Sequence, residues 1–226
     1  MNPEPSFPSA IAFIRDHSLT SLAQAEIEKL ILSGAIQPGE RLGEADMAER
    51  VGVSRGPIRE AFRALEEQGL VRVEKNRGVF VRKITTDEAD ETYTVRMALE
   101  ALAGRILAER ITDAEIGTLR HLLSAMESAC HKGNAKRYSE LNLRFHGTLI
   151  ELTGNTKLRG IYNRLVKTLS LFRAVTLFRS DTLSVSLEEH RRIVEAIASR
   201  NGDAASEAMS AHVEASRHRM HATQGV

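Results

Sequence analysis

The spacing of the apolar positions changes after Gly69. Before this glycine, Ile58, Ala61, Phe62 and Leu65 recur at intervals of three and four residues, which places them on one face of a helix. After it, valines recur at every second position on both sides of a short polar stretch, at Val71 and Val73 and again at Val79 and Val81, a pattern typical of two strands joined by a turn. The sequence therefore predicts a helix followed by a β-hairpin.

A shorter helix is predicted just before this one. Met47, Ala48 and Val51 share one apolar face, and Gly52 can adopt the positive φ that ends a helix. Ser54 is a good N-cap for the helix that follows. Two helices separated by so short a turn form a helix-turn-helix.

The first part of the chain consists of an opening segment and a compact domain. Several prolines in residues 1–16 predict a flexible tail, and the domain is expected to span residues 17–84. An apolar series that stops before Gly34 indicates the first helix of this domain. That series consists of Leu22, Ile27, Leu30 and Ile31.

The rest of the chain shows helical periodicity throughout. Thr85 and Glu88 are typical of a helix N-terminus, and we expect residues 85–222 to form an antiparallel bundle of six helices. The predicted fold class is mostly α, with an N-terminal winged helix-turn-helix, a small β-hairpin wing and a C-terminal six-helix bundle. The six helical segments lie near 87–109, 113–131, 135–152, 156–178, 183–200 and 203–221.

Positive charge is concentrated in the predicted helix-turn-helix. The chain has a formal net charge of only +1, but basic side chains clearly outnumber acidic ones in residues 50–83. Arg55 and Arg59 lie on the polar face of the second helix, near its start, where a recognition helix reads the major groove. The hairpin turn, 75–78, is also basic and can lie along a neighbouring groove. This distribution of charge predicts a DNA-binding surface.

The stretch GVSRGPIREAFRALEEQGLVRVEKNRGVFV resembles the winged helix-turn-helix of the GntR family of bacterial transcription regulators, FadR-like subfamily. The resemblance implies a homodimer that binds double-stranded DNA at a roughly palindromic operator. Family members often carry a polar or basic DNA-contacting residue where this chain has Ala45 beside Glu44, so base contacts are expected from the second helix and the wing. The residues that the resemblance assigns to DNA contact are Ser54, Arg55, Gly56, Arg59, Asn76, Arg77 and Gly78.

Three histidines interrupt the apolar faces of the bundle helices. His146 follows Asn142 by four residues, and His190 and His212 stand where an aliphatic residue is expected. A single histidine on such a face is usually a hydrogen-bonded core residue, but three on three helices of one bundle favour a metal site. The two apolar series are Leu183, Leu187, His190, Val194 and Ile197 in the fifth helix, and Ala205, Ala208, His212 and Ala215 in the sixth.

Residues 87–221 resemble the FCD effector domain of FadR-like regulators, whose motif carries an acidic residue four positions before a histidine and two further histidines on the last two helices. The resemblance implies metal ligands at Asn142, His146, His190 and His212. Because Asn142 stands where the family commonly has aspartate, a divalent cation here keeps more positive charge, which favours an anionic effector. Neutral imidazoles suit zinc or nickel, and the expected effector is a small carboxylate.

Arg96, in the first helix of the bundle, has two interpretations. It lies four residues before Glu100, so the two side chains can form an ion pair on the helix surface. Its segment is also similar to the family's first effector helix, from which Arg96 can point into the bundle and bind the carboxylate of the effector through its planar guanidinium. The sequence leaves both interpretations open.

A ligand-responsive transcription regulator, acting as a repressor, accounts for both parts of the chain. Two alternatives remain: a DNA-binding protein with a purely structural metal ion, and a hydrolase that uses three histidines and a zinc-bound water. No acidic residue stands in a motif for a general base, so we expect no enzyme. The single cysteine excludes an intrachain disulfide, and no apolar run is long enough for a membrane span. Without a basic leader before the weakly apolar opening stretch, the expected location is the cytoplasm.

Overall fold

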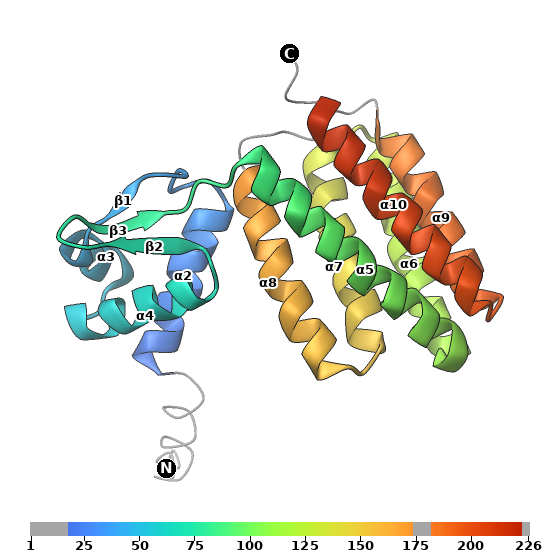
Figure 1. Cartoon of the computed structure of the whole chain (residues 1–226), viewed down its shortest axis with the longest axis horizontal. Coiled ribbons are helices and arrows are strands. Elements are labelled where there is room, and N and C mark those ends of the chain that lie inside the picture. The colour runs from blue at the N-terminus through green and yellow to red at the C-terminus, as the bar shows by residue number, and fades with distance from the viewer. Residues whose placement is uncertain (1–17, 174–181, 223–226) are drawn as a thin grey trace, which may run out of the picture. The chain divides into compact units, whose positions relative to one another are not determined.

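The computed structural model describes residues 18–173 and 182–222. This part of the chain forms nine helices and one three-stranded antiparallel sheet, so the predicted, mostly helical fold class is confirmed (Figure 1). The chain divides into two compact units. Among the described residues, the first contains 18–84 together with 170–173, and the second contains 85–169 and 182–222. The predicted tail at 1–16 lies outside the described residues. No helix in the described part is long and apolar enough to cross a membrane.

The first unit is a helix-turn-helix followed by a wing. Its elements are α2 (Leu19–Leu32), β1 (Arg41–Leu42), α3 (Glu44–Val51), α4 (Arg55–Glu67), β2 (Val71–Glu74) and β3 (Gly78–Val81). β3 is the central strand of the sheet, with β2 antiparallel on one side and β1 antiparallel on the other. The short β1 adds a strand to the predicted hairpin, and two residues are too few for an alternating pattern to reveal it.

The core of the first unit follows the predicted apolar face of α4. Ile58, Phe62 and Leu65 are buried and belong to one cluster with the buried face of α2. α2 buries residues at intervals of four, so Leu22, which was expected in the core, instead lies at the surface with 46% of its area exposed. The buried residues of α2 are Ala23, Ile27 and Ile31.

The turns of the first unit have the backbone conformations that their residues favour. Gly52 ends α3 with φ 76°, in the left-handed region that glycine tolerates. Ser54 takes the predicted N-cap position of α4, but its side chain makes no capping hydrogen bond. At the tip of the wing, Asn76 and Gly78 have φ 61° and 109°, and the chain reverses there from β2 into β3.

The second unit is the predicted six-helix bundle, in which successive helices run in opposite directions (Figure 1). The first two helices begin with side-chain caps: Thr85 accepts a hydrogen bond from the Glu88 backbone, and Thr112 and Glu115 form a reciprocal capping box. The predicted end of the fourth helix, at 178, lies outside the described residues. The helices are α5 (Thr86–Arg110), α6 (Asp113–His131), α7 (Ala135–Leu152), α8 (Thr156–Arg173), α9 (Leu183–Ala198) and α10 (Gly202–Ala222).

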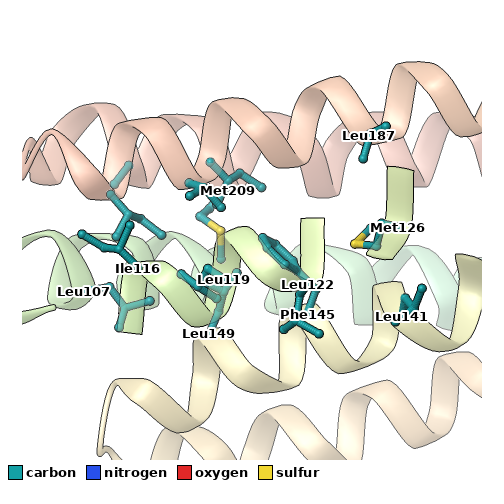
Figure 2. Close-up of a cluster of buried hydrophobic side chains, with 14 of the residues drawn as sticks. Leu107, Ile116, Leu119, Leu122, Met126, Leu141, Phe145, Leu149, Leu187 and Met209 are labelled. Atoms are coloured by element: carbon teal, nitrogen blue, oxygen red, sulfur yellow. The ribbon is translucent and has the colours of Figure 1, made fainter. Parts of the chain in front are cut away.

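Apolar side chains from α5, α6, α7, α9 and α10 fill the core of this bundle (Figure 2). The series predicted for α9 is buried along its whole length. On α10 the prediction is partly wrong, because Ala208 and Ala215 are only half-buried whereas Met209 and Val213 are fully buried. α10 is oriented so that its larger apolar side chains point into the core, because their burial removes more apolar area from water.

α5 and α10 pack closely at Gly104. A Cβ atom at this position would lie 2.7 Å from the Ala205 carbonyl oxygen and 3.0 Å from Cγ of Met209. Such contacts are too short for any side chain larger than hydrogen. Gly104 therefore allows the backbones of the two helices to approach each other.

Candidate metal centre and DNA-contacting surface

Three buried histidines from three helices meet inside the bundle. His146 of α7, His190 of α9 and His212 of α10 each have 2% or less of their surface exposed. The Nε2 atom of His146 lies 3.1 Å from that of His212 and 3.2 Å from that of His190. One nitrogen from each ring falls within a common span of 4.8 Å. The structure thus brings the three predicted histidines together.

The other ring nitrogen of each histidine is held by an acceptor. Nδ1 of His146 is 2.7 Å from a Glu100 carboxylate oxygen, and Nδ1 of His212 is 2.8 Å from a Glu189 carboxylate oxygen. Nδ1 of His190 lies 2.5 Å from the Ser186 carbonyl oxygen, one turn earlier on α9. A carbonyl or an ionised carboxylate can only accept, so each Nδ1 donates its proton outward. Each Nε2 then directs a lone pair at the other two.

Both carboxylates are in turn paired with an arginine. Nε of Arg96 lies 2.5 Å from Glu100, while two nitrogens of Arg219 each lie 2.7 Å from Glu189. We call the two chains the Arg96 relay (Arg96, Glu100, His146) and the Arg219 relay (Arg219, Glu189, His212). The Arg96 relay is buried, with 3% of Arg96 and none of Glu100 exposed, whereas Arg219 and Glu189 are half-buried.

The relays keep both glutamates ionised. Burial alone would raise the pKa of Glu100, but the charge of Arg96 and the contact with His146 outweigh it and hold that pKa well below its usual range. For Glu189, burial is likewise outweighed by hydrogen bonds from His212 and Arg219, which lower its pKa to about 2. An ionised carboxylate that accepts from Nδ1 raises the basicity of the imidazole and fixes its orientation.

The imidazoles of His190 and His212 are held uncharged. Burial first, and then the proximity of the other histidines, lowers the pKa of His190 well below its usual range. Burial also lowers the pKa of His212 to about 4, against the raising effect of Glu189. Phe145 packs edge-on against the rings of His146 and His190, with centroids 5.6 and 4.9 Å away. With each Nδ1 engaged by an outward acceptor and Phe145 packed beside two of the rings, the three Nε2 atoms face one point.

This donor set fits a divalent cation. Three lone pairs that face each other at 3.1–3.2 Å repel one another unless a positive centre lies between them. Zinc–nitrogen bonds of about 2.0–2.1 Å place neighbouring ligand nitrogens roughly 3–3.5 Å apart, which matches this spacing. The three histidines could therefore hold a metal ion, and each has the outer hydrogen bond that metal-bound histidines normally make.

Asn142 and Arg96 are the other two predicted site residues of the bundle. Asn142 is buried on α7, one turn before His146. Arg96 combines features of both interpretations: it forms the ion pair with Glu100, and it does so inside the bundle rather than on a helix surface. Its guanidinium also lies about 6 Å from the ring centres of Tyr93 and Tyr162. An incoming carboxylate would have to compete with Glu100 for Arg96.

The residues predicted to contact DNA lie at the surface of the first unit. On α4 and its cap, Ser54, Arg55, Gly56 and Arg59 are exposed, and at the wing so are Asn76 and Arg77, while Gly78 is half-buried. Two of the arginines are paired with glutamates. Arg59 Nε lies 3.2 Å from Glu44 of α3, and a terminal nitrogen of Arg77 lies 2.5 Å from Glu74 of β2.

Residues 91–215 of the chain match the FCD domain, and residues 19–81 match the bacterial regulatory proteins of the gntR family. A relative, the HTH-type transcriptional regulator YdhC of Bacillus subtilis, is 32% identical over 83% of this chain and 84% of its own length. The chain belongs to the GntR family. Its family members are transcriptional regulators rather than enzymes, as the sequence predicts.

Further comparisons place this GntR-family regulator among relatives of similar length. The HTH-type transcriptional repressor RspR of Escherichia coli is 29% identical over 79% of this chain and 78% of its own length. The solved structure of McbR/YncC from E. coli has the same fold, with a TM-score of 0.78, 20% identity, and coverage of 91% of this chain and 98% of its own. The fold is thus shared at low sequence identity.

Sequence reasoning did not find Glu189, Arg219 or the Ser186 carbonyl, and it considered Glu100 only as the partner of Arg96. Glu189 directly precedes His190, but adjacent residues on a helix point about 100° apart, so Glu189 faces α10 and its His212 instead. A contact between helices of this kind leaves no mark in the spacing of one helix. Both glutamates are engaged by an arginine and a histidine.

Proposed function

We propose that this GntR-family regulator is a repressor that binds a palindromic operator as a homodimer and responds to a small carboxylate. The first unit contacts DNA through α4 and the wing. The second unit holds a divalent cation, zinc or nickel, at His146, His190 and His212. The convergence of their three Nε2 lone pairs carries this proposal. As a transcription regulator, it acts in the cytoplasm.

The charges around the histidines support an anionic ligand. Glu100 is neutralised by Arg96, and Glu189 by Arg219, so neither relay offsets a cation bound at the histidines. Asn142, which we propose as a further ligand, is uncharged. When bound, a divalent cation supplies a positive charge that no nearby ligand neutralises, and a carboxylate gains from approaching it. Arg96 is a second candidate contact for that carboxylate, in competition with Glu100.

The position of the site supports its coupling to DNA binding. The three rings and the glutamates that hold two of them come from α5, α7, α9 and α10, so a ligand there contacts helices that span the bundle. A ligand that favours one arrangement of these helices shifts the balance between them, and operator affinity changes to the extent that DNA also favours one arrangement. Repression is proposed because relatives such as RspR and the gluconate operon repressor of Bacillus licheniformis carry that name.

A thermal-shift screen of small carboxylates, with and without a chelator, tests this function. We expect at least one carboxylate to raise the melting temperature of the metal-loaded protein and to lose its effect after chelation. The same compound should change operator affinity in a gel shift. If carboxylates change neither quantity while the protein retains stoichiometric metal, the metal is structural and the effector proposal is wrong.

Substitution of one metal-ligating histidine tests the metal site itself. His190→Ala removes one imidazole from the set and should abolish stoichiometric metal in the purified protein, as measured by elemental analysis. Full metal content in this variant would show that the histidines are hydrogen-bonded core residues. His121→Ala, which removes an exposed histidine of α6, should leave the metal content unchanged.

A further inference from the structure

The recognition arginine of α4 is held by a residue of the neighbouring helix. Glu44 is the first residue of α3, and its carboxylate lies 3.2 Å from Arg59. The nitrogen in contact is Nε, at the base of the guanidinium. The contact therefore uses the one nitrogen that a bidentate interaction through the two terminal nitrogens does not need.

The wing arginines are held in a different way. Glu74 contacts terminal nitrogens of both Arg72 and Arg77, at 2.8 and 2.5 Å. Part of the hydrogen-bonding fork of each is already occupied, so these side chains are less suited to reading a base edge. Among the described ion pairs of this surface, the one between Glu44 and Arg59 thus differs in leaving the fork of its arginine free.

The Glu44–Arg59 pair contributes little to folding. More than a third of each side chain is exposed, and ion pairs in such positions are screened by water. The pair instead limits the number of rotamers that the Arg59 side chain can adopt. A long, unpaired arginine samples many rotamers and can reach the phosphates of any DNA, whereas a paired one presents its fork in one direction.

We propose that Glu44 is a specificity-determining residue that orients Arg59 to read a guanine. The terminal nitrogens of Arg59 donate to O6 and N7 of the base while Nε remains with Glu44. The same carboxylate disfavours contact with phosphate, because its charge repels the DNA backbone. α3, which has Ala45 where family members often carry a DNA-contacting residue, then acts on the operator through Arg59. This inference rests on the proposed role of Arg59 in DNA binding.

Selection from a random pool of DNA duplexes by the full chain tests the proposal. We expect the wild type to enrich a guanine at one position of each half-site and Arg59→Ala to lose that preference. Glu44→Ala should lose it at the same position, with a drop of about tenfold in the ratio of operator to arbitrary DNA affinity. Glu44→Gln, which keeps the shape of the side chain but loses its charge, should also weaken the preference, because the contact with Nε is an ion pair.

Control variants distinguish a failure of this proposal from a failure of its premise, the role of Arg59 in DNA binding. They also exclude a general effect of removing one negative charge. Glu49→Gln removes the same charge from an exposed position of α3 and should leave the selected sequence unchanged. If Arg59→Ala leaves the guanine in place, the premise is wrong. If Arg59→Ala loses the guanine but Glu44→Ala keeps it, or if Glu44→Ala changes a different base, Glu44 does not orient Arg59. Additive effects in the double variant on operator binding would also overturn the proposal.

Discussion

The two units of this regulator use the same ion pair, arginine with glutamate, in opposite environments. In the bundle, Arg96 and Glu100 have 3% and 0% of their side chains exposed. In the helix-turn-helix, Arg59 and Glu44 have 60% and 42% exposed. The buried pair is fixed because each charge lacks water to replace its partner. In the exposed pair each charge stays in contact with water, and the terminal nitrogens of Arg59 remain available to DNA.

The comparison shows that burial decides what an ion pair does. A buried pair adds little over apolar packing, yet the loss of one partner strands the other charge away from water. An exposed pair is screened, and the loss of one partner leaves the other solvated. The Arg219 relay lies between these limits, since Arg219 and Glu189 are half-buried. Four substitutions test this gradient.

The largest effect is expected at the buried pair. Glu100→Gln leaves Arg96 charged and unneutralised inside the bundle, which should lower the free energy of unfolding by about 3–5 kcal/mol. Chemical denaturation followed by circular dichroism measures it. Glu140→Gln, at an exposed pair with Arg137, should cost less than about 1 kcal/mol. Equal losses in the two variants would contradict the role assigned to burial.

A smaller effect is expected at the half-buried relay, and on metal binding rather than on folding. Glu189→Gln weakens the acceptor of His212 and should reduce metal affinity about 10–100-fold. Competition with a chromophoric chelator measures this affinity. Glu188→Gln, the neighbouring exposed glutamate, serves as the control. Unchanged affinity in Glu189→Gln would mean that His212 is held in place without the relay.

At the DNA-contacting surface the effect should fall on binding alone. Arg59→Ala removes the proposed contact to a base edge and should weaken operator binding by about 1–3 kcal/mol while leaving the melting temperature unchanged. Gel shifts at fixed salt concentration measure it. Arg63→Ala, one turn further along α4 and paired with Glu60, should have a clearly smaller effect. Similar losses at both positions would indicate general charge attraction instead of base recognition.

The smallest effect is expected on folding at the exposed pair. Glu44→Gln should change the free energy of unfolding by less than about 1 kcal/mol, because water and salt screen this pair. Denaturation at low and high salt measures the change and its screening. A loss as large as that expected for Glu100→Gln would remove the contrast between the two units.

Apolar spacing was sufficient to predict the helices, because each buries one face whose period is a property of the helix itself. It placed α4 and α9 well, and it failed where packing chose between neighbouring positions. On α10 the core selected Met209 over Ala208, and on α2 it selected Ala23 over Leu22. The two-residue β1 depends on its pairing with β3 and has no pattern of its own.

The candidate site was predictable only in its innermost residues. Histidines on apolar faces are unusual enough to be noticed in a sequence, and the three of them lie together. Their outer partners are ordinary glutamates and an arginine, which become distinctive only through contacts between helices. Glu44 is a similar case, since its contact with Arg59 depends on how α3 meets α4.

Gly104 fixes the separation of α5 and α10. A side chain there would place its Cβ 2.7 Å from the Ala205 carbonyl oxygen, so the two helices would have to move apart. They meet again near the start of α5, where Nε2 of His221 lies 2.8 Å from a carboxylate oxygen of Asp90. His212 lies on α10 between these two contacts, so a change in the separation of the helices at Gly104 would also displace its ring.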